Sequence, residues 1–140
     1  MSHRGSELRP YGMSRFVNAV VALGAFFFLA GGAWAFFWPH SFYSTVATFP
    51  PFNLHLFHDA GAFQLGIGAA LTAALFTRDA LIVGLAGGAA GAVVHAISHV
   101  VDRNLGGNPS DPWTLSGLAL LLVVATILRY RQQRNSSRKA

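Results

Sequence analysis

The sequence contains no cysteine and few charged side chains. Without a thiol, the chain can form neither a disulfide, nor a thiolate nucleophile, nor a cysteine-based metal site. Charged residues make up 11% of the 140 residues, well below the roughly one quarter that is usual in soluble domains. Hydrophobic residues make up 53%. This balance excludes an ordinary soluble domain and predicts a membrane protein.

Four apolar segments have about the length that a helix needs to cross a bilayer. A spanning helix requires roughly 20 predominantly apolar residues. The segments cover residues 16–38, 56–76, 80–101 and 113–130. Pro39 ends the first segment, and the fourth reaches spanning length only with Tyr130 as an interfacial anchor. The sequence therefore predicts an all-α fold: one domain, an integral membrane four-helix bundle, with polar tails at 1–14 and 131–140 and lipid as its main partner.

The basic residues lie almost entirely on one side of the predicted membrane. Nine of the ten Lys and Arg residues precede the first span, lie at or beyond the end of the fourth, or lie between the second and third. Arg103 alone lies in a loop on the other side. Because basic residues accumulate in cytoplasmic segments, this asymmetry places both termini in the cytoplasm. The excess positive charge is then a topology signal, and no nucleic-acid partner is expected.

The first span is open to a second interpretation as a signal peptide. Arginines precede its apolar run, and "AWA" at 33–35 has the small-x-small form of a cleavage site. The run is longer than a signal core, however, and continues into the aromatic residues 36–38. We expect the span to be retained; cleavage would leave three spans with the same orientation.

Ionisable residues lie at the outer end of the third span. At 3.6 residues per turn, His95, His99 and Asp102 share one face of that helix. The face continues inward as a stripe of glycines at 84, 88 and 91, which in lipid allows two helices to approach closely. We therefore expect these three side chains to face a neighbouring helix.

The outer end of the second span repeats this pattern. His55 and Asp59 share a face, His58 lies beside it, and small residues at 62, 66, 69 and 73 continue the line inward. The short connection around Arg78 predicts an antiparallel hairpin of the second and third spans. In that hairpin the six ionisable residues occupy one level, about 10 Å thick. Imidazoles and carboxylates on facing helices are the usual ligands of metal sites in helical bundles. The predicted metal ligands are His55, His58, Asp59, His95, His99 and Asp102.

Two local features concern the start and the opposite side of the second span. Asn53 follows "FPPF" and is predicted to cap the helix that begins near Leu54. Gln64 points away from the ionisable face, together with Gly61 and Gly68. We expect Gln64 to pack or hydrogen-bond against another span.

The donor set limits the metals that the site would take. Imidazole and carboxylate suit Zn, Cu(II) or Fe, and the absence of sulfur ligands near the site disfavours Cu(I). The "HAISH" segment lacks the glutamate of zinc peptidases, so redox chemistry, metal handling or sensing is favoured over proteolysis. Two alternatives stay open: a structural or assembly subunit, in which the polar residues only fix helix packing, and a b-type haem protein. A membrane protein partner or a homo-oligomer is compatible with each, and the pattern decides neither for nor against an enzyme.

The segments "FNLHLFHDAGAFQLGIG" and "HAISH" resemble a group of small four-helix inner-membrane proteins that is common in actinobacteria. The matching positions are Asn53, His55, Asp59 and Gly61 at the start of the second span, then His95 and His99 at the end of the third. His58 lies outside this pattern. The resemblance implies a multi-pass protein of the bacterial inner membrane and carries no activity with it.

Overall fold

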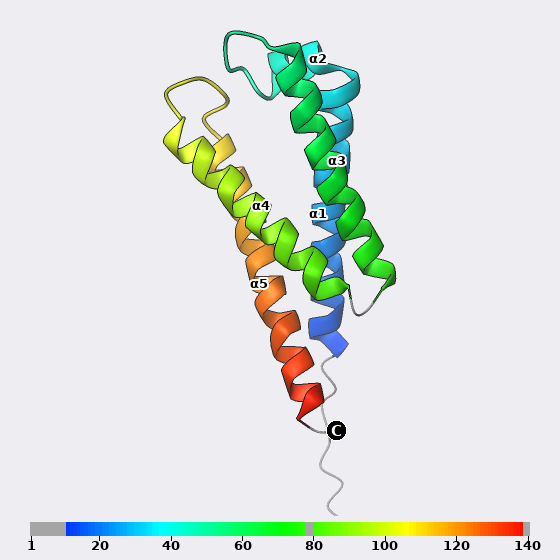
Figure 1. Ribbon diagram of the computed structural model, residues 1–140. Helices are drawn as coiled ribbons and strands as arrows, with labels where there is room; N and C mark the ends of the chain where they lie inside the picture. The colour runs from blue at the N-terminus through cyan, green and yellow to red at the C-terminus, as the bar shows by residue number, and fades with distance from the viewer. Residues whose placement is uncertain (1–10, 78–79, 139–140) are drawn as a thin grey trace, which may run out of the picture.

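The computed structural model describes residues 11–77 and 80–138, which form five helices and no strand (Figure 1). The helices are α1 (Tyr11–Phe37), α2 (Pro39–Thr45), α3 (Leu54–Phe76), α4 (Leu81–Val101) and α5 (Asp111–Ser137). All except α2 contain an apolar segment long enough to cross a membrane. The predicted all-α fold with four spans is therefore confirmed, and the protein is an integral membrane protein.

Three helical segments go beyond the helices that the sequence predicts. Helix α1 begins at Tyr11, inside the predicted polar tail 1–14. Pro39 does follow the end of α1, but it also occupies the first position of α2, where its fixed φ and missing N–H are tolerated. Helix α5 continues to Ser137, through the segment predicted to be a polar tail. That segment is rich in Arg and Gln, which are good helix formers, so it extends the helix past its apolar part.

The four long helices are arranged as two antiparallel pairs. Helix α1 packs most extensively on α3, and α4 on α5, while the contacts of α3 with α4 and of α1 with α5 are smaller. Figure 1 shows α3 and α4 side by side where the chain connects them and diverging toward the opposite end. We call that opposite end, which carries α2 and the loops 46–53 and 102–110, the α2 end.

The glycine stripe of α4 faces α3, as predicted. A Cβ on Gly84 would lie 2.8 Å from the Cβ of Ala74, and one on Gly91 would lie 3.4 Å from Ile67. The intervening Gly88 faces Leu71 at 3.1 Å, so the separation grows toward the α2 end. The contacting residues are numbered nearly symmetrically about residue 79, which confirms the hairpin level predicted about Arg78.

The face of α3 that was predicted to meet α4 is instead exposed. Ala62, Gly66, Ala69 and Ala73 are exposed, and no atom lies within 4 Å of a Cβ placed on Gly66. Helix α3 presents its other small residues to α1. A Cβ on Gly61 would lie 2.8 Å from the carbonyl oxygen of Gly32, and one on Gly68 would lie 2.9 Å from the amide nitrogen of Leu29. Gln64 lies on the same side of α3, and a Cβ on Gly31 of α1 would lie 2.9 Å from its Oε1 atom, so the prediction that Gln64 packs on another span is confirmed.

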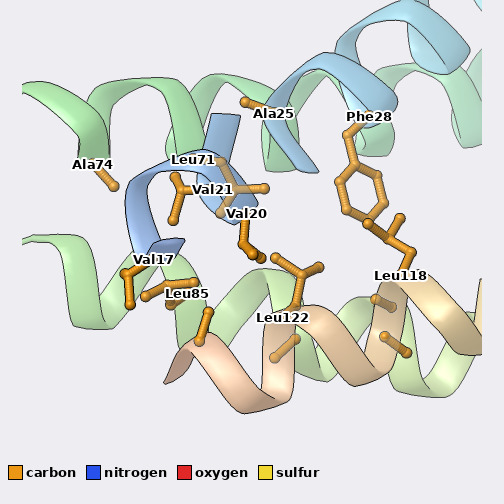
Figure 2. Close-up of a cluster of buried hydrophobic side chains, with 14 of the residues drawn as sticks. Val17, Val20, Val21, Ala25, Phe28, Leu71, Ala74, Leu85, Leu118 and Leu122 are labelled. Carbon is orange, nitrogen blue, oxygen red and sulfur yellow. The ribbon is translucent and has the colours of Figure 1, made fainter. Parts of the chain in front are cut away.

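A leucine- and valine-rich core joins the two helix pairs. Val21, Leu71, Leu85 and Leu122 are fully buried, and each comes from a different long helix. Figure 2 shows Phe28 and Leu118 extending this core along α1 and α5. Among the described residues no polar or charged residue is buried, so polar chemistry is confined to the two ends of the bundle and to partly exposed positions.

Candidate functional site

Two loops meet at the α2 end although α3 and α4 diverge there. The side-chain amide of Asn108 donates to the carbonyl oxygen of Val46 at 2.9 Å, and the backbone N–H of Gly107 donates to that of Thr48 at 3.3 Å. Gly107 has a φ of +82°, and Gly106, with a φ of +141°, has no room for a Cβ beside Thr48. Glycine is required at both positions because other residues are strained at such angles. The loop 102–110 is thereby fixed against the segment that follows α2.

The histidine pair of α4 lies beneath this loop contact. His95 and His99 are one helical turn apart, and their Nε2 atoms are 3.2 Å apart. Both residues are partly buried, and the ring of Phe49 from the loop 46–53 stands edge-on to His99 at 5.7 Å. The short distance between the two Nε2 atoms confirms the prediction that the two histidines share one face of α4.

The other ring nitrogen of His99, Nδ1, faces a carboxylate from the next helix, α5. The Oδ2 atom of Asp111 lies 3.8 Å from Nδ1 of His99, and the two side chains are only 16% and 17% exposed. The same oxygen accepts a hydrogen bond of 2.8 Å from the backbone N–H of Asn108, which fixes the carboxylate. Asp111, His99 and His95 therefore form a continuous series of polar contacts. We call these three residues the α4–α5 set.

The carboxylate beside His99 is that of Asp111 and not that of Asp102, which the sequence pattern predicts for this position. Asp102 is the C-cap residue of α4, and its backbone N–H donates to the carbonyl oxygen of Ser98 at 2.8 Å. The signal for Asp111 was present in the short loop 102–110, because a short connection brings the start of one antiparallel helix beside the end of the other.

The ionisable residues of α3 lie apart from the α4–α5 set. His55 and Asp59 pair with each other, with Nε2 and Oδ2 3.4 Å apart, and their side chains are 86% and 54% exposed. The ring of His58 lies 5.0 Å from that of Phe36, so this histidine packs against α1. The N-cap prediction at the same end is confirmed, since the side chain of Asn53 accepts a hydrogen bond from the N–H of Leu56 at 3.2 Å.

The structure thus does not gather the six predicted ligands into one cluster. Within residues 11–77 and 80–138, no three His, Asp or Glu side chains are grouped closely enough to hold a metal ion between them. Two causes separate the predicted ligands. Helix α3 turns its glycine face to α1, which leaves His55 and Asp59 exposed, and α3 diverges from α4 toward the α2 end.

A cavity of about 450 Å³ opens beside His99. It lies between the end of α4, the loop 102–110 and the start of α5. Arg103, Asn104, Trp113 and Ser116 contribute to its wall. The cavity and the α4–α5 set share His99, so this corner of the molecule combines ionisable groups with space for a ligand.

Comparisons with known proteins identify no relative of this chain. No protein-family model matches it, and neither a curated protein nor a solved structure gives a significant match. The resemblance to small four-helix inner-membrane proteins therefore stays a prediction, and the function must be argued from the site itself.

Proposed function

We propose that this integral membrane protein binds one divalent transition-metal ion at its α2 end, through the Nε2 atoms of His95 and His99. The distance between these atoms, 3.2 Å, is the observation that carries the proposal. Two nitrogens bound to one tetrahedral zinc at about 2.0–2.1 Å each lie about 3.3 Å apart. The 3.2 Å contact is a hydrogen bond between the two rings, and its length also matches the spacing of two ligands of a single ion. Metal binding would release the proton that the two nitrogens share and replace it with the ion.

Asp111 has the position of a residue that orients a metal ligand. A metal-bound histidine commonly donates its second ring N–H to a carboxylate, which fixes the tautomer and raises the basicity of the coordinating nitrogen. Nδ1 of His99 faces the Asp111 carboxylate at 3.8 Å, and Nε2 faces His95. The backbone N–H of Asn108 holds that carboxylate in place.

The small number of protein ligands favours an open site. Structural zinc sites are closed by four protein ligands, whereas open sites keep positions for water or an exogenous ligand. With two imidazoles from the chain, the remaining positions fall to solvent or to a molecule that the protein handles. Zn, Cu(II) and Fe suit this donor set, and the roles it fits are metal handling, sensing or redox chemistry. The positive-inside asymmetry predicts that the α2 end lies outside the cytoplasm. The resemblance to small four-helix inner-membrane proteins favours the bacterial inner membrane as the location.

Metal titration of the purified protein tests this proposal. The protein is prepared without a histidine tag, stripped with a chelator, and titrated with Zn, Cu(II) and Fe(II) while bound metal is counted. We expect one ion per chain, loss of binding in His95→Ala and His99→Ala, and affinity lowered by about 10- to 100-fold in Asp111→Asn. His55→Ala is the matched control, because it removes an exposed imidazole at the same end and should leave binding unchanged.

A structural role is the second candidate, and a specific observation favours it. A chain of three contacts joins the α4–α5 pair to the segment after α2: His99 contacts Asp111, Asp111 contacts Asn108, and Asn108 contacts Val46. If these residues have only a structural role, His99→Ala lowers the melting temperature of the metal-free protein. Added metal then leaves the melting temperatures of both the variant and the parent unchanged. The third alternative, a b-type haem protein, requires a Soret band in the same preparation.

A further inference from the structure

Arg103 is the exception to the charge asymmetry of this chain. Eight of the other nine basic residues lie within the first 15 residues or from residue 129 onward, and Arg78 lies between α3 and α4, whereas Arg103 lies in the loop at the α2 end. Basic residues on this side oppose the bias that orients the protein in the membrane. A local function would explain why a basic residue lies on this side of the membrane. Arg103 lines the cavity beside His99.

The wall of the cavity has a polar part and an apolar part. Arg103, Asn104 and Ser116 offer hydrogen-bond donors, whereas Val100, Pro112 and Trp113 supply apolar surface. Among the residues that the structure describes, those that line the cavity include no Asp or Glu. The carboxylate of Asp111, which adjoins this wall, accepts from the backbone N–H of Asn108 and faces His99. The guanidinium of Arg103 in the wall therefore favours an anion, and its planar set of donors matches phosphate especially well. The apolar part then fits an uncharged portion of the same molecule.

The cavity lies at the ends of two spanning helices, which is where the surface of the membrane is expected. Its residues belong to the last turn of α4, the loop 102–110 and the first turns of α5, where two spanning helices end and begin. Trp113 is 81% exposed at this level, and exposed tryptophans are typical of the region of lipid headgroups. A ligand in the cavity would therefore lie at the level of phospholipid phosphates.

We propose that this cavity binds a phosphate group carried on an apolar body, the chemistry of an anionic phospholipid, with Arg103 contacting the phosphate and Trp113 the apolar part. The site goes beyond the proposed metal site, since its recognition residues are distinct from His95 and Asp111. His99 borders both, so a bound phosphate group and a bound metal ion would be neighbours. The phosphate-bearing molecule could be a membrane lipid or a soluble phosphate compound, and the test separates the two.

Native mass spectrometry of the full chain in detergent, with a chelator present, tests the site independently of any metal. Phosphatidylglycerol and phosphatidylcholine are titrated separately, and inorganic phosphate is added as a competitor. We expect phosphatidylglycerol to bind more tightly. Arg103→Gln should weaken its binding about tenfold or more, the effect typical of losing a charged hydrogen-bond donor. Ser116→Leu, which fills cavity space and keeps Arg103, should weaken it as well.

Arg131→Gln is the matched control, since it removes the same charge from an exposed position on the far part of α5. Thermal melting and size-exclusion chromatography confirm that each variant folds. Competition by millimolar inorganic phosphate would assign the site to soluble phosphate compounds, and its absence would assign the site to lipid. Equal binding of the two lipids, or phosphatidylglycerol binding that is unchanged in both cavity variants, would overturn the proposal.

Discussion

Two glycines on α3 should respond in opposite ways to the same substitution. Gly61 packs on α1, where a new Cβ would lie 2.8 Å from both the carbonyl oxygen of Gly32 and the amide nitrogen of Phe36. Both are backbone atoms, so a rotamer change cannot relieve the contact and the two helices must move apart. A Cβ on Gly66 meets no atom within 4 Å. Alanine should therefore disturb the fold at Gly61 and be accommodated at Gly66.

The size of the effect is best estimated as the difference in stability between Gly61→Ala and Gly66→Ala. Both variants replace glycine by alanine in the interior of one helix, so the gain in helix propensity, up to about 1 kcal/mol, largely cancels between them. What is left is the overpacking at Gly61, which typically costs about 1–3 kcal/mol. Gly61→Ala should accordingly be about 1–3 kcal/mol less stable than Gly66→Ala, and Gly66→Ala should be as stable as the parent or more so.

Unfolding in mixed micelles with increasing dodecyl sulfate, followed by circular dichroism, measures this difference. A Gly66→Ala variant as destabilised as Gly61→Ala would refute the reasoning. It would mean that the small-residue face of α3 is packed against a neighbour, either α4, as the sequence pattern predicted, or a second copy of the chain.

Three further predictions concern topology, capping and the loop contact. Reporter fusions at the C-terminus and in the loop near Thr45 should report cytoplasm and exterior respectively, and the reverse pattern would invert the side on which the α2 end lies. Asn53→Ala should lower the free energy of unfolding by about 1 kcal/mol, because the N–H of Leu56 loses its cap; an unchanged melting curve would argue against that hydrogen bond. Asn108→Ala should accelerate amide hydrogen exchange in loops 46–53 and 102–110 while the spans stay protected, because its side chain holds Val46; equal exchange in both proteins would deny it that role.

The sequence was sufficient to predict features that depend on local pattern. Span length and composition predicted the four long helices, and the positions of Asn53 and Pro39 predicted where α3 begins and where α1 ends. The short connection around Arg78 predicted the level of the hairpin, and the 3.6-residue repeat placed His95 and His99 together. Each of these follows from residues a few positions apart.

The orientation of α3 about its own axis could not be predicted in this way. Its small residues lie on two faces, one with Gly61 and Gly68 and one with Gly66 and several alanines. In a soluble bundle, polarity would distinguish the buried face, but lipid is as apolar as a protein interior and small residues alone do not say which face packs. The choice depends on the partner helix α1, which approaches at Gly32.

The composition of the candidate site depends on the same tertiary choice. With α3 packed on α1, the imidazole of His55 is exposed and the carboxylate beside His99 comes from α5 instead. Asp111 is far from the "HAISH" motif in spacing and does not continue its helical face, so a pattern confined to one helix could not find it. The motif identified the histidines, and the fold supplied their partner.

Zinc K-edge X-ray absorption of the tag-free protein loaded with one equivalent of Zn²⁺ counts the imidazole ligands and so tests whether His95 and His99 bind the ion. We expect two imidazoles at about 2.0–2.1 Å, the remaining positions filled by oxygen ligands, and loss of the imidazole signal in His95→Ala but not in His55→Ala. Three or more imidazoles, or a spectrum that changes with His55→Ala, would contradict this assignment by returning the histidines of α3 to the site. Failure to retain zinc at all would leave the polar contacts at the α2 end with a structural role.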